Sequence, residues 1–268
     1  MKSLQNSIEN IVMNAGGEWA VVVEDLDKEK MIDINSNIQF PAKSLIKVPI
    51  MAALFATYER RKIILSNYLT LKREDIVKGS GILQLLSPGT QLTIYDLMTL
   101  MIVQSDNTAT NILIDLIGFE EVENFMQSIG MEDSCLKKKL MIYPVQNEFD
   151  NENYITASDI SLLFRKLATG KVISLYSSQQ MISILKQQQI RNGIPAYLPN
   201  SKSTIIGVQP KWELANKTGW DSEHQHDAGI LYAGQRSMAI SVLSKNADST
   251  KALDAIANIR KEVYQTMI

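Results

Sequence analysis

Segments with the composition of β-strands lie near both ends of the chain, and this arrangement constrains the fold more than any other feature. Residues 19–23 and 31–34 flank a polar turn and predict a β-hairpin. Three later strands are predicted at residues 212–218, 228–233 and 237–243. We therefore expect one antiparallel sheet of about five strands, built from the two chain ends.

The middle of the chain has helical periodicity instead. Apolar residues recur at three- and four-residue spacing in five segments, at 94–103, 108–117, 120–129, 159–167 and 179–185. The N-terminal residues before Gly16 and residues 250–267 predict two flanking helices. The expected fold class is α+β, with residues 1–38 and 203–268 together forming a sheet lobe and residues 39–202 an inserted all-helical lobe. A cleft between the two lobes is the expected place for an active site.

Composition excludes several classes of partner. The chain has 268 residues and a formal net charge of −2, so it lacks the basic surface that binds nucleic acid or an anionic membrane. No apolar run reaches the length of a membrane span, and the N-terminal residues lack a signal peptide's apolar core. The sequence as given therefore predicts a cytoplasmic protein. A secreted or cell-envelope protein whose leader had been removed would have the same features.

The segment around Ser44 is the first candidate for chemistry. Pro41 favours an extended entry into a helix, and an apolar run follows at residues 48–55. Ser44 and Lys47 are separated by slightly less than one helical turn, so they share a face at the helix N-terminus. Backbone N–H groups there stabilise an anionic intermediate, and a desolvated Lys47 can accept the serine's proton.

This spacing is not specific by itself, because it recurs at residues 134–137 and 183–186, where ordinary surface sequence explains it. Two further motifs lie elsewhere in the chain. Ser105-Asp106-Asn107 separates two predicted helices, where it also suits a helix N-cap. Lys217-Thr218-Gly219 ends a predicted strand, where a glycine lets another chain or a ligand approach the backbone.

The three motifs, in this order and widely spaced, resemble the trio of class A β-lactamases and penicillin-binding proteins. The chain is similar to class A β-lactamase-like serine hydrolases over nearly its whole length. Three smaller likenesses accompany the motifs: Thr-Ala-Thr-Asn at residues 108–111, Gly-Ile-Pro-Ala at 193–196 and His-Asp-Ala-Gly at 226–229. The fold implied by the resemblance is the β-lactamase/transpeptidase type.

The resemblance also implies catalytic roles. Ser44 would be the acylated nucleophile, and Lys47 would be its general base or proton relay. Ser105 would pass a proton to the leaving nitrogen. The oxyanion hole would consist of the backbone N–H groups of Ser44 and Trp220.

Substrate-binding roles follow from the same resemblance. Asn107 would hold the substrate's amide carbonyl. Lys217 and Thr218, next to Gly219, would hold the substrate carboxylate, and Lys217 would add positive field to the cleft. The expected partner is a small molecule: a β-lactam, a peptide or an ester. No cofactor is expected.

The chain departs from the family in the loop that supplies the deacylating base. Class A β-lactamases carry a glutamate there in a Glu-x-x-Leu-Asn pattern. The matching stretch, residues 136–154, contains Glu148 and Glu152, neither of which is followed by Leu-Asn. We therefore expect the serine to be acylated and its ester to be hydrolysed slowly, because base catalysis of water attack is worth ~10²–10⁴-fold.

Other candidate residues carry less specific signals. Residues 200–209 are longer than the family's usual connection and predict an extra loop at the cleft edge. Arg236, on a predicted turn, is expected at the surface, and no arginine is evident for a further carboxylate contact. His224 and His226 point the same way on a strand, but no further ligands at suitable spacing favour a metal site. We expect His226, beside Asp227, to line the cleft or be hydrogen-bonded.

Three functions remain open on the sequence. The first is an acyl-serine hydrolase that opens β-lactams slowly. The second is a D,D-peptidase or esterase of the same fold, which would explain the missing glutamate. The third is a non-catalytic ligand-binding or sensor protein that keeps the motifs without turnover.

Overall fold

The computed structural model describes residues 1–141, 152–190, 197–201 and 207–268. Its main sheet has five antiparallel strands in the order β2-β1-β9-β8-β7. The strands are β1 (Glu18–Asp25), β2 (Lys30–Ile34), β7 (Trp212–Trp220), β8 (His224–Ala233) and β9 (Arg236–Lys245). The N-terminal strand β1 therefore pairs with the C-terminal strand β9, with Val21 opposite Val242. This confirms the predicted fold class.

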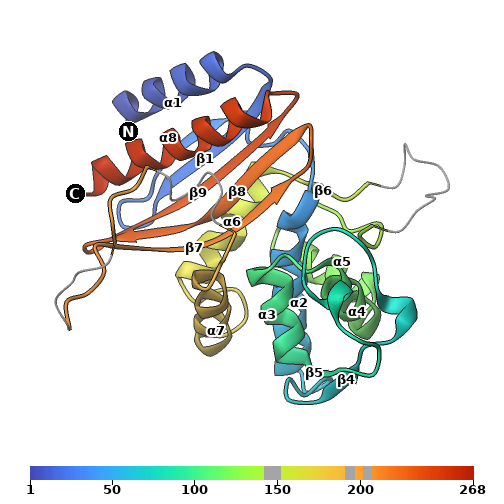
Figure 1. Cartoon of the computed structure of the whole chain (residues 1–268). Coiled ribbons are helices and arrows are strands. Elements are labelled where there is room, and N and C mark those ends of the chain that lie inside the picture. The colour runs from blue at the N-terminus through green and yellow to red at the C-terminus, as the bar shows by residue number, and fades with distance from the viewer. Residues whose placement is uncertain (142–151, 191–196, 202–206) are drawn as a thin grey trace.

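Helices cover both faces of the sheet. Helices α1 (Lys2–Ala15) and α8 (Ser249–Met267) lie on one face, and α6 (Ala157–Ala168) lies on the other (Figure 1). The side chains of β1 alternate between two cores: Val21 and Val23 join the core under α1 and α8, whereas Val22 joins the larger core around the helices. Because both faces are covered, this strand is an uninterrupted apolar run in the sequence.

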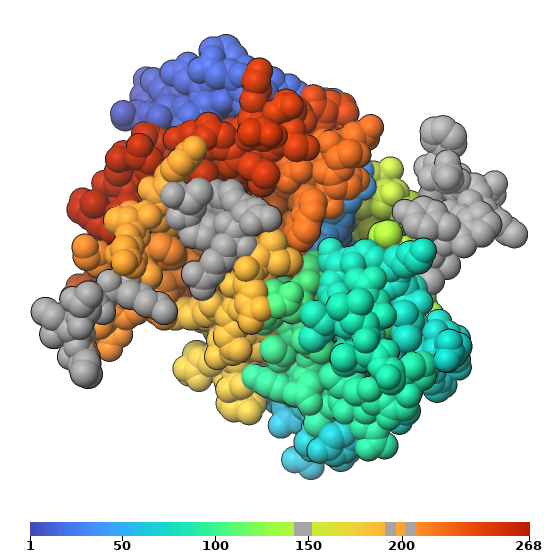
Figure 2. All heavy atoms as spheres, in the orientation of Figure 1, coloured from blue at the N-terminus to red at the C-terminus, as the bar shows by residue number. Residues whose placement is uncertain are grey.

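The remaining helices form the second body of the molecule, below the sheet in Figures 1 and 2. They are α2 (Lys47–Glu59), α3 (Ile94–Val103), α4 (Asn107–Ile117), α5 (Phe119–Ser128) and α7 (Leu175–Lys186). Helix α2 is buried on nearly all sides and forms the centre of this body. No helix in the described ranges is long and apolar enough to cross a membrane.

Short elements complete the same body. Strand β3 (Phe40–Pro41) pairs with β6 (Tyr154–Ile155), and β4 (Tyr68–Thr70) pairs with β5 (Gln91–Thr93). The described residues also include three 3-10 helices: η1 (Lys43–Ile46), η2 (Arg73–Asp75) and η3 (Leu83–Leu85). The stretch that the sequence predicts as all-helical thus also holds two two-stranded sheets, which are too short to have a clear alternating pattern.

Candidate functional site

Ser44 lies where the edge strand of the sheet approaches the helical body. It belongs to η1, and the α-helix α2 begins only at Lys47. A Cβ atom placed on Gly219 of β7 would be 2.9 Å from the Ser44 backbone nitrogen. The strand backbone therefore runs directly against the backbone of Ser44, and only glycine permits this approach.

Lys47 is fully buried and points toward the turn between α3 and α4. Its Nζ donates to the Ser105 carbonyl at 2.6 Å, to Ser105 Oγ at 3.1 Å and to Asn107 Oδ1 at 2.8 Å. The sequence prediction paired Lys47 with Ser44, whereas the hydrogen bonds of the Lys47 amine among the described residues go to Ser105 and Asn107 of the second motif.

Lys217 brings the third motif to the same hydroxyl. It is fully buried on β7, and its Nζ donates to Ser105 Oγ at 3.0 Å and to the Thr218 carbonyl at 2.7 Å. The Ser105 side chain is therefore in contact with two lysine amines at once. Its backbone has φ +54°, a left-handed conformation that non-glycine residues adopt mainly at turns and functional sites.

Burial determines the electrostatics of the two lysines. It lowers the pKa of Lys47 well below its ordinary value, and the charge of Lys217 lowers it further, with Asp106 acting in the opposite direction. Burial likewise lowers the pKa of Lys217 to about 7, against an opposing effect of Asp227. The pair can therefore give up a proton near neutral pH, as a lysine base requires.

A loop wraps around the second motif and fixes it. Asp106 caps α4 by accepting from the Ala109 N–H at 2.9 Å, and its other oxygen accepts from the Leu83 N–H at 2.8 Å. A Cβ atom on Gly81 would lie 2.2 Å from the Asp106 carboxyl carbon, so this position requires glycine. The Asn107 N–H donates to the Ser80 carbonyl at 3.0 Å.

A cavity of about 380 Å³ opens at these residues. It is lined by residues from both bodies of the molecule: Lys43, Ser44, Gly79, Ser80, Asn107, Lys138, Lys139, Leu140, Met141, Glu152, Asn153, Trp220 and Asp221. Ser44 and Asn107 thus share one cavity with Trp220, whose indole is partly exposed. An acyl compound in this cavity would lie against the predicted nucleophile.

Leu140 also lines this cavity. Its backbone N–H and carbonyl both bond to the Asn111 side chain, at 2.9 and 2.8 Å. These two hydrogen bonds between Asn111 and Leu140 form only in the folded loop, so no sequence pattern marked Leu140.

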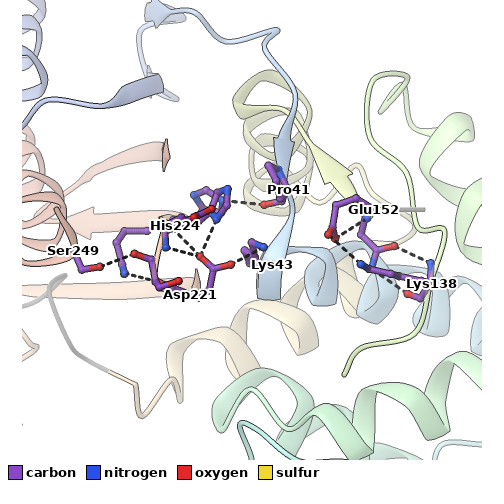
Figure 3. Close-up of polar contacts among 12 residues, drawn as sticks. Pro41, Lys43, Lys138, Glu152, Asp221, His224 and Ser249 are labelled. Carbon is purple, nitrogen blue, oxygen red and sulfur yellow. Dashed lines mark hydrogen bonds and ion pairs between the residues drawn. The ribbon is translucent and has the colours of Figure 1, made fainter. Parts of the chain in front are cut away.

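Glu152 lines the same cavity, but its carboxylate is engaged. One oxygen pairs with Lys138 Nζ at 3.0 Å, and the other accepts from the Asn153 N–H at 3.0 Å (Figure 3). The second candidate, Glu148, lies outside the described residues.

Thr218 faces a different cavity, of about 100 Å³, which lies between β7, β8 and α8. Successive strand residues point to opposite faces, so Thr218 turns away from Lys217. Asp227, directly opposite Thr218 in the sheet, forms a fully buried ion pair with Arg260 of α8 at 3.0 Å and accepts from Asn216 at 3.0 Å. Burial raises the pKa of Asp227 to about 7, although the Arg260 charge opposes this. No sequence pattern marked this ion pair.

The histidines form hydrogen bonds. The Ser244 N–H donates to His226 Nδ1 at 3.2 Å, so Nε2 carries the proton that faces the Pro41 carbonyl at 3.0 Å. Burial lowers the pKa of His226 to about 4, and its ring is therefore neutral. His224 Nδ1 contacts Asp221 at 2.8 Å. Within the described ranges, no three His, Cys, Asp or Glu side chains are arranged to hold a metal ion.

Arg236 opens β9 and pairs with the buried Asp25 at 2.5 Å, on β1. It thus joins two strands of the sheet and does not line the Ser44 cavity. Of the predicted cleft-edge loop, residues 202–206 lie outside the described residues, as does the segment 193–196.

Comparison with known proteins gives a consistent result. The chain matches the beta-lactamase enzyme family over residues 3–267. It is 24% identical over 251 residues to beta-lactamase BRO-1 of Moraxella catarrhalis, an alignment that covers 89% of this chain and 76% of that protein.

Solved structures agree with this match. A beta-lactamase from Sphaerobacter thermophilus superposes with a TM-score of 0.89 at 29% identity, covering 97% of each chain. A mutant of PBP-A, solved as an acyl-enzyme complex with penicillin G, superposes with a TM-score of 0.81 at 26% identity. That alignment covers 100% of this chain and 97% of the other.

Proposed function

Since the chain belongs to the beta-lactamase enzyme family, we propose that it is a serine hydrolase that forms an acyl-enzyme on Ser44 with β-lactams or related amides and esters. We propose further that it hydrolyses this ester slowly. The observation that carries the proposal is the contact of Ser105 Oγ with both Lys47 and Lys217, beside the cavity that Ser44 lines.

In the proposed acylation, Ser44 Oγ attacks the substrate carbonyl carbon and its proton passes to the neutral Lys47 amine. The carbonyl oxygen becomes an anion between the backbone N–H groups of Ser44 and Trp220. The C–N bond then breaks, and Ser105 delivers a proton to the leaving nitrogen. Lys47, which contacts Ser105 Oγ, returns the proton to Ser105. The products are the Ser44 ester and a neutral amine group.

Two observations support slow hydrolysis of that ester. Leu140, which lines the cavity, offers no base to a water molecule. Glu152 lies in the same cavity, but its carboxylate is held by Lys138 and by its own backbone neighbour. Without a general base, water attack loses about 10²–10⁴-fold in rate. The penicillin adduct of the PBP-A mutant, a protein of similar structure, is consistent with an ester that accumulates.

Intact-protein mass spectrometry after mixing with penicillin G tests the proposal. We expect the mass to increase by one penicillin molecule and to return over minutes or longer, and we expect no adduct on Ser44→Ala. Glu152→Gln should leave the decay of the adduct unchanged. Turnover that is fast and leaves no adduct would refute slow hydrolysis, and an adduct on Ser44→Ala would refute the nucleophile.

The alternatives are distinguished by substrate preference. A D,D-peptidase or esterase would cleave D-alanyl peptides or p-nitrophenyl esters faster than nitrocefin, with loss of activity in Ser44→Ala. A non-catalytic sensor would show the same residual hydrolysis with and without Ser44. We expect Ser44-dependent reaction with nitrocefin, because the two lysines and Ser105 are connected as an acylating enzyme requires.

A further inference from the structure

One ion pair joins the two bodies of the molecule at the mouth of the Ser44 cavity. Lys43 Nζ lies 2.7 Å from Asp221 Oδ2, and both residues line the cavity (Figure 3). Lys43 comes directly before Ser44, and Asp221 comes directly after Trp220. The pair therefore connects the neighbours of the two backbone N–H groups that the proposed oxyanion hole requires.

Both partners are held in place for this contact. Asp221 Oδ1 accepts from the backbone N–H groups of Glu223 and His224, at 2.9 and 2.8 Å, and contacts the His224 ring. This fixes the turn between β7 and β8 and directs Oδ2 toward Lys43. Burial alone would raise the pKa of Asp221, but hydrogen bonds from Lys43, His224 and Glu223 outweigh it and hold the pKa below its ordinary value. Asp221 is therefore ionised at neutral pH.

The backbone on the other side also has an uncommon geometry. Lys43 has φ +46°, in the left-handed region that costs free energy for a residue with a side chain. Its Cβ would lie 3.2 Å from a Cβ atom placed on Gly219. Close by, the His226 ring contacts the Pro41 carbonyl at 3.0 Å. The segment before Ser44 is thus attached to β8 at Pro41 and to the β7–β8 turn at Lys43.

We propose that the Lys43–Asp221 ion pair is a clamp that sets the spacing between the backbone N–H groups of Ser44 and Trp220. Both residues are positioning residues, since they act through the backbone of their neighbours. For the reaction under "Proposed function", on which this consequence rests, the clamp would favour the transition state. An oxyanion donor that is displaced loses its effect because such donors must match the place where charge develops.

The test uses Asp221→Asn, Lys43→Met and the double variant in the full chain. Asparagine keeps the turn, because its side-chain oxygen still accepts from the two N–H groups, while the charge is lost. Glu213→Gln is the matched control: it removes the Lys186–Glu213 pair, which also joins a helix to β7 at 2.7 Å but is remote from Ser44. Equal thermal melting of all four proteins shows that they remain folded.

Site-resolved amide hydrogen exchange measures the clamp without any substrate. We expect exchange at the Leu45 and Asp221 amides, which are hydrogen-bonded directly beside Ser44 and Trp220, to be about 5-fold faster or more in both single variants, and unchanged in Glu213→Gln. The penicillin acylation rate constant at saturating penicillin should fall by roughly 10–100-fold in both single variants, although the two substitutions change the charge of the cavity in opposite directions. The double variant should be no worse than either single variant, because the two changes remove one interaction.

Unchanged amide exchange in both single variants would overturn the clamp, as would additive losses in the double variant. If penicillin does not acylate the wild-type protein, the proposed function is refuted. Faster exchange at both amides in the single variants would still support the clamp. The two failures are therefore distinguishable.

Discussion

Ser105 Oγ lies about equally far from the amines of Lys47 and Lys217, at 3.1 and 3.0 Å. Two charged ammonium groups at this distance from one hydroxyl would repel each other strongly inside a protein. Burial and mutual repulsion together favour a state in which Lys47 is neutral and Lys217 carries the charge. In the proposed reaction, Lys47 would then serve as the base for Ser44, and Lys217 would supply a positive charge to the substrate.

The pH dependence of acylation follows from these shifts. The rate should rise with pH as Lys47 loses its proton, and fall as pH increases through about 7, where Lys217 loses its charge. Lys217→Arg keeps the charge at all working pH values, so the descending limb should disappear even if the maximum rate is lower. Stopped-flow acylation from pH 5 to 9 measures both profiles. A descending limb at the same pH in the arginine variant would contradict the assignment to Lys217.

Leu140 offers a second test at the residue scale. Leu140→Glu would bring a carboxylate into the cavity that Ser44 lines, at a position whose backbone Asn111 already holds. We expect adduct hydrolysis to accelerate about 10-fold or more, since a positioned general base is worth ~10²–10⁴-fold. In Leu140→Gln the new side chain has the shape of glutamate but cannot act as a base, so adduct hydrolysis should stay slow. Equal rates in the two variants would mean that something else limits hydrolysis.

At the scale of elements, the close approach of β7 to η1 depends on one residue. In Gly219→Ala the new Cβ would meet the backbone nitrogens of Ser44 and Leu45 at 2.9 and 3.1 Å. The strand must then move away, and we expect acylation to fall ~10²-fold because small displacements at reacting groups are costly. Gly234→Ala is the control. It has open space around it and φ +60°, so it should cost about 1 kcal/mol of stability without changing acylation.

The docking of α8 on the sheet depends on a buried ion pair. Arg260→Met leaves the Asp227 carboxylate buried without its cation, which costs about 3–5 kcal/mol in unfolding free energy. Arg260→Met combined with Asp227→Leu removes both charges and should recover most of that loss. Urea unfolding of the two variants measures the difference. A double variant that is no more stable than Arg260→Met would argue against this account.

At the scale of the whole molecule, the main sheet brings together strands from the two ends of the chain. Strand β1 lies between β2 and β9, so the first 35 residues supply two strands of the sheet, one of them interior, and the last 57 residues supply the other three. Both cores use residues from this sheet, and the apolar side chains on its two faces join the two bodies into one packed structure.

A chain that lacks residues 1–35 should therefore fail to fold as a unit. It would expose the edge of β9 and the apolar face of α8, which α1 covers in the intact protein. We expect loss of the cooperative urea transition and of near-ultraviolet circular dichroism. A deletion variant with a transition as sharp as that of the full chain would show that the helical body folds without the N-terminal strand.

Local patterns determined much of this protein by themselves. The strands at both ends and the helices between them were predictable because period-2 and period-3.6 patterns report which face of a segment is buried. The three motifs pointed to Ser44, Ser105 and Lys217 through their resemblance to the trio of class A β-lactamases and penicillin-binding proteins. The missing Glu-x-x-Leu-Asn pattern was equally visible.

Only the tertiary structure decided what surrounds those residues. The contacts of Lys47 and Lys217 with one hydroxyl, the Lys43–Asp221 pair and the Asp227–Arg260 pair join residues that are 33 to 178 positions apart. Such contacts leave no local pattern, since a lysine in the sequence is the same whether its side chain ends in water or in a core. Burial and charge proximity set the pKa of a side chain, and both are properties of the folded chain.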